Sequence, residues 1–486
     1  MDGFNLILRP LTSTEKAIVQ AEKRKKQKDD QRIADCLKWQ DVDRTKECFL
    51  IDELPPEDAW TTFKLNKTRP PSIGDVFRMF ITPALMQLLH DDFPDPITLG
   101  RRGKDKMRLR QFTPTTAQLW ETMAVYIWIL GRGQKPVEGR GESAPLKDAV
   151  DDAWDFFKTN CGVEPMAKEY IRRTISTYHF GLKYSLLISE NFTAILGKLG
   201  QYVAGDEKLY YFTGVSGNVR LVISKPGRLG LWMYELCVRV TIDGKEYPFL
   251  MHTFMHDSLV DSVTVSSVVQ RWVEAMWSVG ADLVPAGTSP CPKTFLIADS
   301  YYMSSATRTY LTEKGQYFSL SCSKDRIALE VSRIHSDNQP DITGVTKTIW
   351  NSESKELVTY HHDTQKGVGK KYNITYGAQR STIKQKIKDN EYIIPGYSFY
   401  KNCFEACDNF NRRLHDRCWP HKRGGRNVTG ELGAHHDFLM ACVIQNTITA
   451  YCWARGQRPE LQNFKTLLTE LAIDLYAYAI DQATRI

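Results

Sequence analysis

LGLWMYELCVRVTI at residues 229–242, Asp243-Gly244, and YPFLM at residues 247–251 form the stretch that decides the fold of this chain. Both runs are rich in the aromatic, β-branched and other apolar residues that strands favour. An Asp-Gly pair between two such runs is a strong sign of a β-hairpin. We therefore predict two antiparallel strands in the middle of the chain.

Shorter apolar runs on both sides of this hairpin extend the predicted sheet. Strand-like runs cover 209–212 and 218–223 before it, and 294–299 and 317–322 after it. Helical periodicity separates the later runs, at 263–279 and 304–314. A meander followed by alternating strands and helices predicts an α/β sheet with an antiparallel part.

The remainder of the chain is helical or polar. Apolar residues recur at three- and four-residue intervals from about 75 to 202, at 398–414 and from 434 to the end, which predicts helices. Residues 329–394 are polar and β-leaning, and they predict a small β-rich insertion. Residues 13–35 predict a polar helix, whose basic run is either a DNA-contacting or nuclear-localisation segment or a solvated face.

The bulk composition bounds the class of protein. The chain has 486 residues, of which 42% are hydrophobic and 25% charged, and its formal net charge is +7. These values are typical of a globular chain with room for several domains. No apolar run reaches the roughly 18 residues of a membrane span, and the first residues lack the apolar region of a signal peptide. We expect a soluble intracellular protein with no membrane partner.

Clusters of Lys and Arg predict contact with nucleic acid. They can neutralise phosphates, and Tyr301, Tyr302 and Trp419 can stack on exposed bases. Any one basic run is usually a solvated face, but several beside an acidic set favour a DNA partner. The segments are 23–28, 101–110, 366–371, 380–388 and 412–426.

Acidic residues far apart in the sequence form a candidate carboxylate set. Asp206 and Glu207 adjoin each other, Asp299 ends a buried apolar run, and Glu405 and Asp408 lie three apart on a predicted helix. If the fold joins them, they suit a two-metal centre, because Mg²⁺ is held by a few carboxylates plus waters and substrate phosphates. The ordinary alternatives are an exposed turn, a helix N-cap and a solvated helix face, respectively.

Several motifs share a characteristic order and spacing. They are Asp206-Glu207-Lys208 with the block from Lys225 to Gly230, Ala298-Asp299-Ser300-Tyr-Tyr-Met-Ser304, Asn402-Cys-Phe-Glu405-Ala-Cys-Asp408-Asn-Phe410, and Trp419-Pro420 before an apolar helix. The first segment and its block resemble the Asp-Glu-Gln and Lys-Pro-x-x-x-Gly motifs of piggyBac-type transposases and their domesticated relatives. The segment around Asp299 resembles their Cys-Asp-Asn-x-Phe-x-Ser motif, and the segment around Glu405 and Asp408 resembles their Gly-Gly-Val-Asp-x-x-Asp-Gln-Met motif. Trp419-Pro420 resembles their Trp-Pro motif. The resemblance covers roughly residues 75 to 486.

This resemblance implies a reaction and a site. Asp206, Asp299 and Asp408 would be the catalytic carboxylates, and Glu405 stands where the family has a further Asp. Asp206 and Asp299 would hold one Mg²⁺ or Mn²⁺ ion, and Asp408 with Glu405 would hold a second. The protein would be a DDE-type DNA transposase, which hydrolyses a DNA phosphodiester and then transfers the strand.

The resemblance also implies an architecture. The expected fold class is α/β, with an RNase H-like catalytic core interrupted by a β-rich insertion, and a mainly α-helical DNA-binding and dimerisation domain. The expected boundaries are 1–69 for a basic, partly disordered N-terminal region, 70–202 and 414–486 for the helical domain, 203–328 and 395–413 for the core, and 329–394 for the insertion.

The implied partners are double-stranded DNA, at transposon ends and at the target, and a second copy of the chain, in the nucleus. Two alternatives stay open. One is a domesticated, catalytically inactive DNA- or chromatin-binding protein, and the other is a globular protein whose acidic residues never converge.

Overall fold

The computed structural model divides the chain into two compact units. The larger unit consists of Leu54–Tyr317 and Lys401–Ile486, and the smaller unit of Met1–Glu53 and Phe318–Tyr400. The domain boundaries expected at 202, 328, 394 and 413 stay predictions. The described residues are 20, 21, 24, 27, 31, 39–41, 60–93, 97–99, 110–131, 146–180, 182–211, 218–221, 229–256, 264–281, 294–327, 330, 346–351, 353, 354, 356–362, 370–377, 384–387, 390–393, 405–417 and 428–485.

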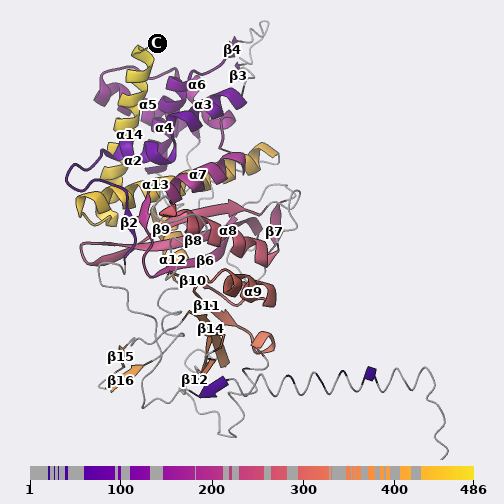
Figure 1. Ribbon diagram of the computed structural model, residues 1–486. Coiled ribbons are helices and arrows are strands. Elements are labelled where there is room, and N and C mark those ends of the chain that lie inside the picture. The colour runs from indigo at the N-terminus through magenta and orange to yellow at the C-terminus, as the bar shows by residue number, and fades with distance from the viewer. Residues whose placement is uncertain are drawn as a thin grey trace, which may run out of the picture. The chain divides into compact units, whose positions relative to one another are not determined.

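The sheet of the larger unit is mixed (Figure 1). Strand β10 (Phe295–Ala298) pairs in parallel with β6 (Tyr202–Tyr211), which pairs antiparallel with β8 (Leu229–Ile242). On the other side of β8, β7 (Val219–Leu221) and β9 (Lys245–Met255) pair antiparallel with its two ends. The predicted α/β sheet with an antiparallel part is confirmed.

The hairpin of β8 and β9 forms as predicted from the sequence. Asp243 and Gly244 have φ angles of 48° and 70°, the positive values that a two-residue type I′ turn requires. Arg458 ties this turn to the loop after α13 (Val428–Arg455), because its Nη2 donates to the carbonyl of Asp243 at 2.8 Å. Tyr247 adds a second tie through a hydrogen bond to Glu460 at 2.9 Å.

Side chains from two helices close the outer edge of β9. Among the described strands β9 pairs only with β8, which leaves its outward backbone groups to other partners. Asn446 of α13 accepts from the backbone N–H of Leu250 and donates to its carbonyl, at 3.1 and 2.7 Å. Ser189 of α7 (Leu182–Ala194) makes the same pair of bonds with Thr253, at 3.1 and 2.6 Å.

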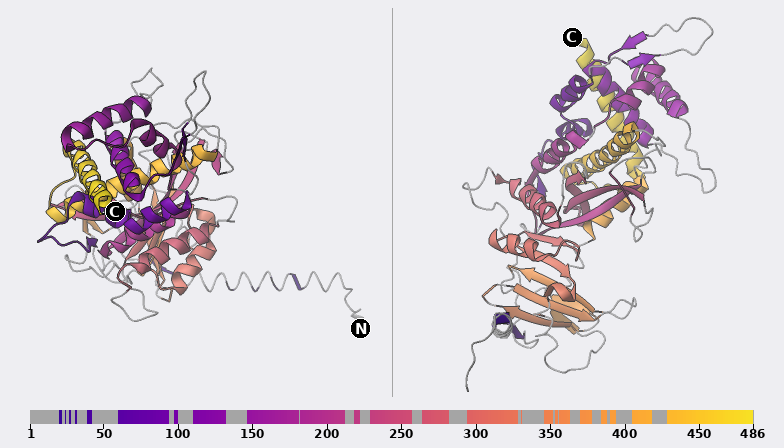
Figure 2. Two further views of the ribbon diagram at one scale, coloured as in Figure 1. Left: turned by 90° about the horizontal axis from the view of Figure 1, so that it is seen from above. Right: turned by 90° about the vertical axis from the view of Figure 1, so that its right-hand side faces the viewer.

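Helices cover both faces of the sheet and extend beyond it, and Figure 2 shows α14 in yellow among the purple helices. Apolar residues all around α4 are buried, so this helix is central to the helical part. Of the described helices, none has the length and apolar character needed to span a membrane. The helices of the larger unit are α2 (Ile73–Phe80), α3 (Pro83–Asp92), α4 (Thr116–Gly131), α5 (Leu146–Cys161), α6 (Lys168–Thr177), α7 (Leu182–Ala194), α8 (Val265–Ser278), α9 (Ser305–Glu313), α12 (Ala406–Arg417), α13 (Val428–Arg455) and α14 (Leu461–Thr484).

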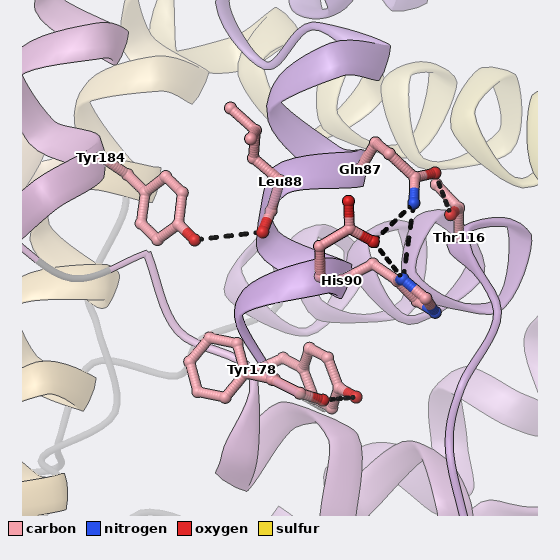
Figure 3. Close-up of polar contacts among 8 residues, drawn as sticks. Gln87, Leu88, His90, Thr116, Tyr178 and Tyr184 are labelled. Carbon is pink, nitrogen blue, oxygen red and sulfur yellow. Dashed lines mark hydrogen bonds and ion pairs between the residues drawn. The ribbon is translucent and has the colours of Figure 1, made fainter. Parts of the chain in front are cut away.

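Tyrosines satisfy backbone groups at the end of α3, where helix carbonyls lack intrahelical partners. Tyr178 donates to the carbonyl of Phe93 at 3.2 Å, and the hydroxyl of Tyr184 donates to the carboxylate of Asp92 and lies 3.3 Å from the carbonyl of Leu88 (Figure 3). Gln87 bridges α3 to the start of α4 by accepting from Thr116 at 2.9 Å. These bonds fix α3 against the helices that follow it.

The region from 75 to 202, predicted to be helical, also contains short strands. β3 (Ile97–Leu99) pairs with β4 (Arg110–Phe112), and β5 (Leu196–Lys198) pairs with β2 (Thr62–Phe63). These strands have only two or three residues each, which is too short for a period-two pattern to be visible in the sequence.

The smaller unit is β-rich, as predicted for residues 329–394. Its antiparallel sheet has the order β1-β12-β13-β14-β11, with β1 (Trp39–Asp41), β11 (Phe318–Cys322), β12 (Thr346–Asn351), β13 (Glu356–His362) and β14 (Lys370–Tyr376). A separate hairpin joins β15 (Lys384–Ile387) to β16 (Asn390–Ile393), and Lys324–Ile327 forms a 3-10 helix. The described residues between 20 and 31 are helical, and most of the five basic segments lie outside the described residues.

Gly205 allows α8 to pack directly on β6. A Cβ atom at this position would lie 2.5 Å from Cζ3 of Trp272, a distance that real Cβ atoms do not reach. Gly205→Ala should therefore lower the free energy of unfolding by about 1–3 kcal/mol, as overpacking does. Urea denaturation measures this change. In a Trp272→Phe background the same substitution should cost less, and an equal cost in both backgrounds would contradict the packing argument.

His252 on β9 should make stability depend on pH. Burial, with the Arg271 guanidinium as the second cause, lowers the pKa of His252 to about 4. An unfolded histidine has a pKa of about 6.5, so the unfolded state binds the proton first as the pH falls. The stabilisation is complete above about pH 6.5 and is lost towards pH 4, by up to about 3 kcal/mol.

Urea unfolding at pH 7.5, 6 and 5 tests this dependence, with His252→Gln as the variant that cannot titrate. Burial also lowers the pKa of His435 to about 4, so part of the slope should remain in the variant. The same slope in the variant and the native chain would contradict the prediction.

Candidate functional site

Asp206 lies in β6, and Asp299 immediately follows β10, the strand that pairs in parallel with β6. The register of β10 with β6 aligns Ala298 with Gly205, so the two aspartates are the residues that follow this aligned pair. Neighbouring strands are about 4.8 Å apart, and aligned residues share a face of the sheet. The fold thus brings together two carboxylates that lie far apart in the sequence.

Asp206 belongs to a strand and does not form an exposed turn. It lies inside β6 with 8% of its surface exposed, so the turn that Asp206-Glu207 would form as an ordinary acidic pair is wrong. In the sequence, the glycine before Asp206 suggests a turn. In the structure, Gly205 lies in the strand, and its lack of a side chain leaves room for the ring of Trp272. The Oδ1 atom of Asp206 accepts from the backbone N–H of Glu207 at 2.8 Å.

Asp299 begins a turn and is not the N-cap of the helix that follows. Its Oδ1 accepts from the backbone N–H of Tyr301 at 2.8 Å. The N-cap of α9 is Ser304, whose hydroxyl accepts from the N–H of Thr307 at 3.0 Å. The ordinary N-cap role proposed for Asp299 from sequence is therefore wrong, and its carboxylate is held at the carboxyl end of β10.

Tyr302 packs under the strand pair and donates to a carboxylate. Its hydroxyl donates to Oε2 of Glu207 at 2.7 Å. Burial raises its pKa well above the usual range, and the charges of Glu207, Asp206 and Asp299 act in the same direction. The phenol is therefore neutral and a donor, and its full burial makes the expected stacking of Tyr302 on DNA bases wrong. Tyr301 is 47% exposed, and Trp419 lies outside the described residues.

Helix α12 covers the face of the sheet to which Asp206 points. Successive residues of a strand point to opposite faces. Gly205 faces Trp272 of α8, so Asp206 faces away from α8. On this second face the Sγ atom of Cys407 donates to the carbonyl of Ala204 at 3.2 Å.

Asp408 lies in the first turn of α12 and Glu405 directly before the helix, and both are exposed. The carbonyl of Glu405 accepts from the N–H of Asn409 at 2.8 Å, so Glu405 immediately precedes the helix. An acid in the first helical turn is also favoured by the helix dipole. The structure places these two acids at the start of the helix that covers Asp206, but among the described residues they do not join Asp206 and Asp299 in a group of three or more.

The described residues contain no group of three or more His, Cys, Asp and Glu side chains arranged to hold a metal ion. Asp206 and Asp299 fit part of such a site, because Mg²⁺ is commonly held by one or two carboxylates, with waters and substrate phosphates as the other ligands. The roles predicted for all four carboxylates stay predictions.

Glu235 is a further acid beside Asp206 that the sequence motifs do not include. It is the register partner of Asp206 on β8 and is fully buried. Its Oε2 accepts from Nδ2 of Asn411 at 2.6 Å, and Oδ1 of Asn411 accepts from Nζ of Lys208 at 2.6 Å. One signal was available in the sequence, since Glu235 is an acid within a mainly apolar strand.

The fold of this chain is similar to that of a protein whose structure has been solved. No protein-family model matches the chain, and no curated protein matches it. A solved structure, the cryo-EM synaptic complex of piggyBac transposase with hairpin DNA, is similar with a TM-score of 0.57. The match has 10% sequence identity and covers 85% of this chain and 82% of the other. The mixed α/β fold of this chain is therefore similar to that of piggyBac transposase.

Proposed function

We propose that this chain is a DDE-type transposase-like protein that cleaves DNA strands and transfers them to new DNA. The observation that carries the proposal is the placement of Asp206, inside β6, beside Asp299, which follows the end of β10, the parallel partner of β6. An acid at the carboxyl end of a strand, as Asp299 is, lies where α/β sheets bind their ligands. The likeness to a piggyBac transposase fold supports the same reaction class. In this proposal the sheet of β6 to β10 and α12 belong to an RNase H-like core.

The proposed site divides the work between the sheet and α12. Asp206 and Asp299 would bind one divalent ion, and Asp408 with Glu405 would bind a second. Bound Mg²⁺ or Mn²⁺ would supply Lewis-acid stabilisation of the attacking and leaving oxygens. The chain itself holds the aspartates in place, through the backbone N–H groups of Glu207 and Tyr301.

The proposed partner is double-stranded DNA, at transposon ends and at the target, bound by a homodimer in the nucleus. The similar solved structure is a transposase bound to hairpin DNA, which supports a DNA partner. The basic segments at 23–28 and 101–110 carry charge that suits phosphates, and the first suits nuclear import. Exposed Tyr301, two residues after Asp299, is suited to stack on an unpaired base.

A second candidate is a catalytically inactive, transposase-derived protein that binds DNA or chromatin. The exposed positions of Glu405 and Asp408, outside any described three-ligand cluster, favour this candidate. Under it the fold would retain DNA contact without strand cleavage.

Asp299→Asn should separate these two functions. The substitution keeps the size of the side chain and removes its charge, so Mg²⁺-dependent cleavage of hairpin or nicked DNA should fall at least about a hundredfold. DNA affinity and the free energy of unfolding should change little. Asp152→Asn is the matched control, because Asp152 is an exposed aspartate on α5, far along the chain from the proposed site.

Gel assays of labelled hairpin DNA with Mg²⁺ or Mn²⁺ measure cleavage, and anisotropy measures binding. Cleavage by the native chain that survives Asp299→Asn would contradict the assigned role of Asp299. Tight binding without cleavage by the native chain, with either ion, would favour the inactive DNA-binding protein.

A further inference from the structure

We propose that Lys208, Asn411 and Glu235 are positioning residues that hold α12 in place above Asp206. We call these three residues the polar clamp. The inference rests on the proposed function, because the helix that they hold carries Asp408.

The polar clamp is one continuous chain of hydrogen bonds. Lys208 donates from Nζ to Oδ1 of Asn411 at 2.6 Å, and Nδ2 of Asn411 donates to Oε2 of Glu235 at 2.6 Å. An ammonium group can only donate and a carboxylate can only accept, so the orientation of the Asn411 amide is fixed. Both bonds involve a charged group, which makes them stronger than neutral ones.

The burial of Glu235 argues that the clamp does more than stabilise the fold. Its side chain is fully buried and lies directly opposite Asp206, an arrangement of like charges that is unfavourable on a sheet. An apolar residue of similar size would often stabilise such a position at least as well as a buried charge. Glu235 does, however, supply an acceptor for Asn411, which an apolar residue would not.

The contacts also fix the direction of α12. Cys407 is hydrogen-bonded to Ala204, and Asn411 is hydrogen-bonded to Lys208. The second contact is four residues further along both the helix and the strand. The helix therefore follows β6 in the same direction. Asp206 lies midway between the two contacted strand residues, and Asp408 lies between the two contacted helix residues.

Helix α12 is hydrogen-bonded to two strands through Asn411. Lys208 belongs to β6 and Glu235 to β8, so Asn411 is held from two sides. Sliding of α12 along the sheet would break two charge-assisted bonds at once, in addition to disturbing its apolar packing. The clamp thus fixes the distance between the acidic first turn of α12 and the strand that carries Asp206.

A charge-swap pair tests the clamp. Asn411→Asp places a second carboxylate against Glu235, which repels the helix from the sheet. Adding Glu235→Gln restores the chain of bonds, because the introduced amide donates to the introduced carboxylate, and that carboxylate still accepts from Lys208. The double variant has the net charge of the native chain, so restoration reports the pairing itself.

The first measurement is hydrogen–deuterium exchange of the full chain without metal or DNA. Asn411→Asp should raise the exchange rate of α12 amides at least tenfold and leave α4 amides unchanged, while the double variant should return to within about threefold of the native rate. Unchanged exchange in α12, or a double variant that is no better than Asn411→Asp, would overturn the clamp.

The second measurement is the cleavage of hairpin DNA with Mg²⁺. Asn411→Asp should lower kcat at least tenfold with little change in KM for DNA, and the double variant should recover most of kcat. A loosened α12 with unchanged kcat would overturn the positioning role while the proposed function stands. If the native chain cleaves no DNA, the proposed function fails, and the exchange rates alone decide whether the clamp holds the helix.

Discussion

The parallel pairing of β10 with β6 is the constraint on which the candidate site depends. A slip of one residue would turn the side chains of β10 to the opposite face of the sheet and move Asp299 along β6, away from Asp206. Tyr302 opposes such a slip, because it follows Asp299 by three residues and its hydroxyl donates to Glu207 of β6. This contact thus helps to keep Asp299 beside Asp206.

Local patterns in the sequence were sufficient for most elements near the site. The β8–β9 hairpin, α8, β10 and α9 follow from runs of apolar residues and from Asp243-Gly244, because these signals lie within each element. The strand character of Asp206 could not be predicted in this way. It depends on pairing with β10 and β8, and only the contact with Trp272, from a distant helix, explains why a glycine stands inside the strand.

The residues of the site were predictable in kind but not in arrangement. Asp206 and Asp299 could be named as acids at the ends of motifs, yet their proximity follows from a strand register that no single motif contains. Glu235 has no motif, and Asn411 is an ordinary polar residue on an amphipathic helix. Their importance appears only when β6, β8 and α12 meet, since the partner of each lies on another element.

The closed edge of β9 limits how two copies of this chain can associate. A bare outer strand invites a neighbour to add its own strand and so extend the sheet. Here Asn446 and Ser189 already occupy the outward backbone groups of Leu250 and Thr253, and both side chains are fully buried. A second copy would first have to displace two helices, so a dimer of this chain cannot extend the sheet through this edge of β9.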